Sequence, residues 1–198
     1  KLKQVALAET LRKLAENGLS DFYTGALADE LIADLKDAGS SLTKEDFLSH
    51  RAEKLAPLKA RVREADLYNT APPTQGFTSL LILSLFDRLE PKIAESFEHV
   101  HTLIEATKQA FMGYKAIGLG DPNYMTGNAQ DLLDDASALD GMSAAINPEK
   151  ALPWPQPMQT GDTTWFAAAD NEGRVVSCIQ STYFEFGSGV VLPRTGIT

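Results

Sequence analysis

Cysteine, basic charge and long apolar runs are scarce in this sequence of 198 residues. Cys178 is the only cysteine, which excludes an internal disulfide, and its neighbours Val176 and Ile179 favour a small buried side chain. The longest apolar run, 79–86, is too short to cross a bilayer, so we expect no transmembrane segment. With 18 basic and 27 acidic residues the net charge is −9, which disfavours a nucleic-acid partner because nothing would neutralise the phosphates.

Helical spacing of apolar residues dominates the N-terminal and central parts of the chain. It predicts helices over 4–17, 23–37, 76–88 and 94–116, the last with apolar side chains on neighbouring turns at Phe97, Val100, Ile104 and Phe111. The spacing Thr43-x-x-Asp46 resembles a capping signal for one more short helix. The pattern weakens over 57–70 and 118–160, and Pro72-Pro73 interrupts it.

The last 36 residues change to strand-like alternation. Asn171-Glu172-Gly173 fits a three-residue hairpin loop, which pairs Asp170 with Arg174 and places Thr163 opposite Ser181, with Tyr183 on the same face. A two-residue loop would instead pair Thr163 with Thr182. A helical body that leads into a β-hairpin predicts an α+β or layered α/β fold.

Thr163 begins the first of these strands, after a proline-rich stretch at 151–162. A chain cut between Asp162 and Thr163 would give this threonine a free α-amine with a pKa of about 7.7–8.0, close enough to its own hydroxyl to act as a general base. The prolines around Trp154 favour an extended polyproline segment. We interpret it as a linker that must stay mobile before a scissile bond, although it could also bind an aromatic groove.

The motifs that surround Thr163 occur in a characteristic order: a Thr-Thr pair, an alternating strand, a glycine turn, a second strand and then FGSG, here TTWFAAADNEGRVVSCIQSTYFEFGSGVVLPRTGI. This order resembles the small subunit of the γ-glutamyltransferase (γ-glutamyltranspeptidase, glutathione hydrolase) family of N-terminal-nucleophile hydrolases. Upstream, DFYTGALADELIADLKDAGSSLTKEDF, TAPPTQGFTSLLILSLFD and HTLIEATKQAF resemble the large subunit of that family. The resemblance covers nearly the whole chain.

The resemblance implies an αββα sandwich to which residues 1–162 contribute the C-terminal part of a helical large subunit and 163–198 the first strands of a small subunit. It implies self-cleavage between Asp162 and Thr163, a Thr163 nucleophile, a hydrogen bond to it from Ser181, and a substrate contact from Tyr183. The expected reaction is cleavage of γ-glutamyl amides such as glutathione through an acyl-enzyme, followed by hydrolysis or by transfer to an amine. No metal or cofactor is expected.

Two positions depart from the best-known members of the family. Tyr183 stands where they carry asparagine or an acid, which leaves a larger or less polar acyl group open, as in acylases that cleave glutaryl or β-lactam side-chain amides. Trp165 stands in place of a histidine, and we interpret it as a packing residue. The carboxylate-binding arginine and the oxyanion donors of the family fall outside 1–198, so we expect the remaining segments of a longer precursor as partners and no activity from this chain alone.

Other candidate sites in the sequence are weaker. His99 and His101 are two apart on a helix and point to different faces, and the acidic residues of 131–140 lack the spacing of a calcium loop. Gly187-Ser188-Gly189 indicates a turn at the end of a strand, not an anion site. A non-catalytic helical interaction protein remains the alternative of another class. The sequence leaves periplasmic, secreted and cytoplasmic locations all open.

Overall fold

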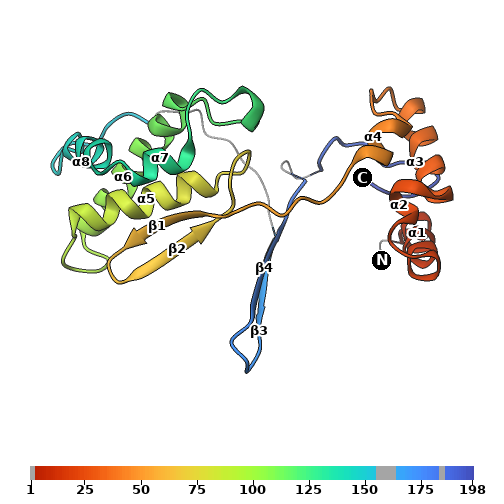
Figure 1. Cartoon of the computed structure of the whole chain (residues 1–198), viewed down its shortest axis with the longest axis horizontal. Coiled ribbons are helices and arrows are strands. Elements are labelled where there is room, and N and C mark those ends of the chain that lie inside the picture. The colour runs from red at the N-terminus through yellow and green to blue at the C-terminus, as the bar shows by residue number, and fades with distance from the viewer. Residues whose placement is uncertain (1–2, 155–163, 183–185) are drawn as a thin grey trace. The chain divides into compact units, whose positions relative to one another are not determined.

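The computed structural model describes residues 3–154, 164–182 and 186–198, which form helices and two small antiparallel sheets (Figure 1). This confirms the α+β class. The chain divides into two compact units, one made of 1–52 with 159–198 and the other of 53–158. None of the described helices combines the length and the apolar character that a membrane span requires.

The first unit begins with four helices, α1 (Val5–Asn17), α2 (Asp21–Thr24), α3 (Ala26–Asp37) and α4 (Lys44–Ser49). The capping signal expected at Thr43 is confirmed: its hydroxyl accepts from the Asp46 N–H, and the Asp46 carboxylate accepts from the Thr43 N–H at 2.7 Å. The Thr43 N–H first, and then the Thr43 hydroxyl, which lies 2.8 Å from the same carboxylate oxygen, lower the pKa of Asp46. A reciprocal cap therefore fixes where α4 begins.

The C-terminal segment of the chain returns to these helices, as the blue trace beside the red and orange ribbons shows (Figure 1). Leu192 packs in a buried cluster with Leu27 and Leu31 of α3. The buried Thr10 hydroxyl of α1 donates to the Thr195 carbonyl at 2.8 Å. Residues far apart in the sequence therefore share one small core.

Asp34 and Arg194 join the same two segments by a charged contact. The Asp34 side chain is fully buried; its oxygens accept from the Arg194 backbone N–H at 2.9 Å and from the Arg194 guanidinium at 2.5 Å. The guanidinium, about half exposed, also reaches Asp37 at 3.2 Å. A buried carboxylate without its cation would be costly, so this pair fixes the position of Arg194 on α3.

The second unit contains β1 (Leu58–Val62), β2 (Ala65–Asn69), α5 (Gly76–Leu89), α6 (Phe97–Ala116), a 3₁₀ turn η1 (Pro122–Tyr124), α7 (Ala129–Asp134) and α8 (Ala136–Ala144). Strands β1 and β2 pair as a hairpin from Leu58 opposite Asn69 to Val62 opposite Ala65. Helix α5 lies along one face of this hairpin, and Leu58 and Ala60 are buried there (Figure 1). The weak sequence pattern over 57–70 therefore conceals a strand pair.

Helices α5 and α6 form the main core of this unit. Ala106 and Ala110 of α6 are fully buried against the fully buried Leu81 and Leu85 of α5. A side chain at Gly113 would approach Leu81 at 3.0 Å, so the glycine allows the close packing of the two helices. Small residues, rather than the apolar residues most visible in the sequence, mark the buried side of α6.

The apolar side chains that mark α6 in the sequence are largely exposed. Phe97 has 75% of its surface accessible, Val100 48% and Ile104 44%. The helix itself is confirmed, and its buried side carries His101, Thr102, Glu105, Ala106, Lys108, Gln109, Ala110 and Gly113. The apolar stripe therefore faces away from the core of this unit.

Replacing Arg194 with methionine is expected to destabilise the first unit more than the loss of an exposed ion pair would, because it leaves the buried Asp34 carboxylate without its cation. Hydrogen exchange at the amides of α3 in the complete protein measures the loss. Arg174→Met, which breaks an exposed pair with Asp170, is the control and should change exchange by less than about 1 kcal/mol. Equal effects of the two variants on exchange would contradict the role of the Asp34–Arg194 pair in holding the first unit together.

Candidate functional site

The C-terminal hairpin carries the region that the sequence assigns to catalysis. Its strands are β3 (Thr164–Ala169) and β4 (Val175–Gln180), paired antiparallel from Thr164 opposite Gln180 to Ala169 opposite Val175. This is the register that the three-residue loop predicts, and it excludes the two-residue alternative. The same numbering, continued by one residue beyond the described pairs, predicts that Thr163 lies opposite Ser181.

Three of the four residues predicted for the site, Asp162, Thr163 and Tyr183, lie outside the described residues, so their placement stays a prediction. Ser181 is described and follows directly after β4, with an exposed side chain. The structure therefore confirms the hairpin on which the prediction depends, whereas the pairing of Thr163 with Ser181 remains to be tested.

The turn at 170–174 has the geometry that fixes this register. The Asp170 N–H donates to the Arg174 carbonyl at 3.1 Å, and the Gly173 N–H donates to the Asp170 carbonyl at 3.2 Å. Gly173 has a φ of +80°, in the left-handed region that favours glycine. These contacts close the loop in its three-residue form, and a shift by one residue would turn the side chains of one strand to the opposite face.

The Asp170 side chain adds a second set of hydrogen bonds to the turn. It accepts from the Arg174 guanidinium at 2.6 Å and from the N–H groups of Glu172 and Arg174 at 2.9 and 3.0 Å. The guanidinium first, and then the backbone donors, hold the pKa of Asp170 below its usual value. The ionised carboxylate is thus part of the turn.

Large apolar side chains are exposed on both faces of the hairpin. Trp165 is 61% exposed, Phe166 55% and Ile179 67%, and the Trp165 indole N–H donates to the Ser177 hydroxyl at 2.9 Å. Cys178 is partly buried rather than fully buried. Within the described residues, Trp165 therefore does not pack into a core, so its expected packing role is not seen there. An isolated two-stranded hairpin is marginally stable, so this one needs further structure around it.

The histidines have structural contacts. The His99 ring lies edge-on to the Phe86 ring, with 5.1 Å between the ring centroids. The His101 ring N–H donates to the Asn147 carbonyl at 2.8 Å. Within the ranges that the structure describes, no three His, Cys, Asp or Glu side chains gather as a metal site would need. A cavity of about 550 Å³ in the second unit is lined mainly by apolar and backbone groups around Pro72 and Met125, and Ser181, the one predicted site residue that the structure describes, does not line it.

The sequence did not reveal a buried polar row on α6. Glu105 and Lys108 form an ion pair with Glu105 fully buried and Lys108 6% exposed. Glu-x-x-Lys on a helix usually indicates a surface pair, and nothing in the local pattern marks these two as buried. Only the position of α6 against the following segment 147–152 distinguishes them.

Comparison with known proteins identifies the family of the whole chain. A family model described as "Gamma-glutamyltranspeptidase" matches residues 1–198. The chain belongs to the γ-glutamyltranspeptidase family. It is 43% identical to an oxamate amidohydrolase proenzyme of Klebsiella pneumoniae over 197 residues, 100% of this chain and 37% of that protein. It is 38% identical to a glutathione hydrolase-like proenzyme of Bacillus subtilis over 98% of this chain and 37% of that protein.

A solved structure agrees with the fold. The crystal structure of a cephalosporin acylase from Bacillus halodurans matches 97% of this chain with a TM-score of 0.85 and 35% identity, over 35% of that protein. The chain thus has the α+β fold of part of an N-terminal-nucleophile hydrolase. It spans little more than a third of the length of the relatives that it matches. The exposed apolar side chains on both faces of the hairpin are consistent with a chain that spans only part of its relatives' length.

Asp170→Ala is expected to weaken the hairpin, because the turn loses its side-chain hydrogen bonds. The contribution of Asp170 has a definite dependence on pH: the folded pKa is lowered, so the contribution is full above the unfolded pKa of about 3.9 and is lost as the pH falls through the lower folded value. Hydrogen exchange of β3 and β4 in the complete protein, compared between pH 3 and 6, measures it. Glu172→Ala is the control, and an equal effect of both variants would contradict the role of Asp170.

Proposed function

We propose that the complete protein is a γ-glutamyltransferase-like amidohydrolase in which Thr163 is the nucleophile after self-cleavage at the Asp162–Thr163 bond. The observation that carries this proposal is the membership of the entire chain in the γ-glutamyltranspeptidase family. The relatives named as proenzymes support processing of a precursor. The hairpin register supports the predicted neighbourhood of Thr163 and Ser181, since the described pairs follow the same numbering.

Self-cleavage would proceed as an acyl shift followed by hydrolysis. The Thr163 hydroxyl attacks the Asp162 carbonyl carbon, the C–O bond forms, the C–N bond breaks, and the hydroxyl proton passes to the departing amine. Water then cleaves the ester, which leaves a carboxylate on Asp162 and restores the Thr163 hydroxyl. The product is a threonine whose own amine can act as its base.

Turnover repeats the same chemistry on an external amide. The free α-amine takes the proton of the Thr163 hydroxyl as the oxygen attacks the substrate carbonyl, and the amine of the substrate leaves with a proton. A hydroxyl from Ser181 orients the nucleophile. Water or an acceptor amine then removes the acyl group, so that hydrolysis and transfer share one intermediate.

The remaining parts of such a site must come from elsewhere in the precursor. A substrate carboxylate requires a cation, and the tetrahedral intermediate requires two donors for its oxyanion. The resemblance assigns these groups to segments outside 1–198. We therefore assign residues 1–162 to the large subunit and 163–198 to the small subunit, and the activity to the assembled enzyme.

A second candidate function is acylase action on a larger acyl group. Tyr183 favours it, because an aromatic ring replaces the asparagine or acid of the best-known family members and changes the shape and polarity of the pocket. The likeness to a cephalosporin acylase structure supports it as well. The similarity to an oxamate amidohydrolase proenzyme adds oxamate to the amides worth testing.

Thr163→Ala in the complete protein is expected to abolish self-cleavage and to leave one band of precursor size on a denaturing gel, because the attacking hydroxyl is gone. Intact-mass analysis of the wild type should give two pieces separated between Asp162 and Thr163. Thr163→Ser is the matched control, since it keeps a hydroxyl and should still cleave. A Thr163→Ala variant that splits at this bond would refute the nucleophile, and a wild type that stays intact would favour the interaction-protein alternative.

The processed enzyme is expected to release amine from a γ-glutamyl anilide faster than from a glutaryl amide, with oxamate as a third substrate in the panel. A preference of about tenfold corresponds to about 1.4 kcal/mol of differential transition-state binding. The ratio of kcat/KM values for the three amides is the measurement. A ratio that favours the glutaryl amide would assign the acylase function instead, and Tyr183→Asn should then shift preference toward the γ-glutamyl substrate.

A further inference from the structure

Three polar side chains on the buried side of α6 bind one backbone segment. The His101 ring N–H donates to the Asn147 carbonyl at 2.8 Å. Lys108 donates to the Leu152 carbonyl at 2.5 Å, and Glu105 accepts from the Leu152 N–H at 3.1 Å. Their spacing of four and three residues places the three side chains on one side of the helix. These five residues are called the α6 clamp below.

The centre of the α6 clamp is a buried ion pair. Glu105 is fully buried and accepts from Lys108 at 2.5 Å. Burial alone would raise the pKa of Glu105, but the hydrogen bonds from Lys108 and from the Leu152 N–H outweigh it and lower the pKa. Desolvation offsets much of the attraction in such a pair, so its main effect is to fix geometry, here the position of Leu152.

An aromatic contact continues this arrangement within the proline-rich linker. The Phe111 ring of α6 meets the Trp154 ring edge-on, with 6.1 Å between the centroids. From Asn147 to Trp154 the chain is thus held at successive positions of α6 from His101 to Phe111. Trp154 lies within the proline-rich stretch 151–162 and is the last residue of it that the structure describes.

We propose that the α6 clamp positions the chain upstream of the Asp162–Thr163 bond for self-cleavage and keeps residues 147–152 on α6 afterwards. This rests on the proposed function. Glu105, Lys108 and His101 act in it as positioning residues, because none of them is assigned to the reacting atoms. They fix the anchored end of the tether on which the scissile bond is presented.

The expected size of the effect follows from the entropy of closing a loop. Trp154 is 46% exposed, so its ring contact is not counted as a buried anchor. Among buried anchors, the clamp ends at Leu152, about ten residues before the bond, and without the clamp the next one is Ile146, about sixteen residues before the bond. For a free chain this lengthening lowers the local concentration of the scissile bond about twofold. Loss of the clamp should therefore slow self-cleavage about twofold or more without abolishing it.

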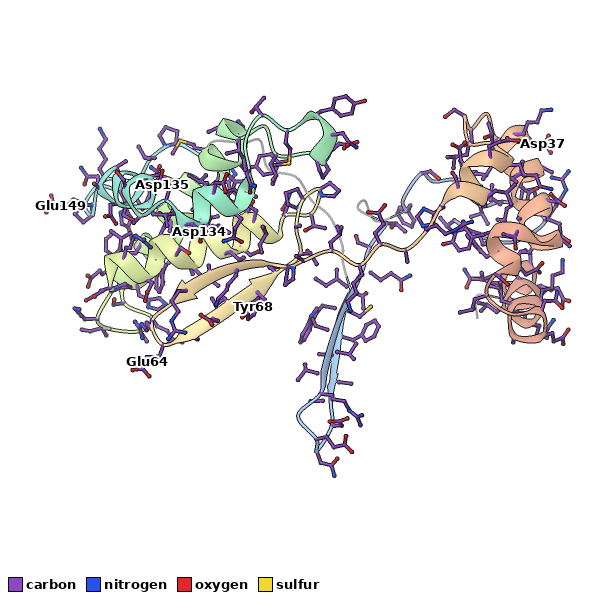
Figure 2. The ribbon with its side chains drawn as sticks, viewed as in Figure 1. Asp37, Glu64, Tyr68, Asp134, Asp135 and Glu149 are labelled. Atoms are coloured by element: carbon purple, nitrogen blue, oxygen red, sulfur yellow. The ribbon has the colours of Figure 1, made fainter. Side chains whose placement is uncertain are left out.

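The test uses the complete precursor made by cell-free synthesis, with cleavage followed over time on a denaturing gel. Glu105→Leu/Lys108→Met removes both charges together and avoids an unpaired buried ion. Glu105→Gln/Lys108→Met keeps an acceptor for the Leu152 N–H and should recover part of the rate. Glu149→Leu/Lys150→Met is the control: it removes the same charges from exposed positions of the same segment, where Glu149 is labelled (Figure 2).

Two readouts separate positioning from folding. Thermal unfolding establishes that each precursor is folded, so that cleavage is expressed as a first-order rate of folded protein. In a Thr163→Ala background, hydrogen exchange over 147–154 should be faster in Glu105→Leu/Lys108→Met than in the control. A folded variant that cleaves at the wild-type rate overturns the proposal, and so does unchanged exchange at these residues. A wild type that does not cleave overturns the proposed function itself.

Discussion

Strand register is the constraint on which the proposed chemistry depends. A nucleophile and the hydroxyl that orients it come from two strands, and a slip of one residue would turn one of them to the opposite face. In this chain the register is set at the far end of the hairpin, where Asp170 accepts from two backbone N–H groups and from Arg174, and Gly173 takes a positive φ. The turn thus determines which residue can lie beside Thr163.

Buried charges anchor the chain on both sides of the proposed cleavage site. Upstream, the ion pair of Glu105 and Lys108 holds Leu152; downstream, Asp34 holds Arg194. In each case a fully buried carboxylate accepts a hydrogen bond from the backbone of the segment that it holds. If the bond between the two segments is cut, the covalent link between them is lost, and these directional contacts still hold each segment on its own unit.

The features of the fold that could be predicted from the sequence are those that a few neighbouring residues determine. The Thr43 cap and the loop at 171–173 were predicted correctly because a few adjacent residues determine them. The β1–β2 hairpin was missed because its turn, which has Arg63 at a φ of 52°, contains no glycine or asparagine. The burial of Glu105 and the exposure of Phe97 were equally hidden, because both depend on which side of α6 meets its neighbours. For the site, the sequence predicted the register, whereas Thr163 and Tyr183 lie outside the described residues.

The exposed apolar surface indicates how the rest of the protein must contribute. Phe97, Val100 and Ile104 form a stripe on α6, and Phe166 and Ile179 lie on the two faces of the hairpin. Contiguous exposed apolar surface is uncommon on soluble monomeric proteins, and it marks a place where further polypeptide packs. The chain spans little more than a third of its relatives. Because a lone hairpin is only marginally stable, we expect β3 and β4 to gain rigidity from additional structure packed against them. Self-cleavage is therefore expected to follow assembly of the whole precursor, since only a rigid hairpin holds the hydroxyl against the carbonyl that it attacks.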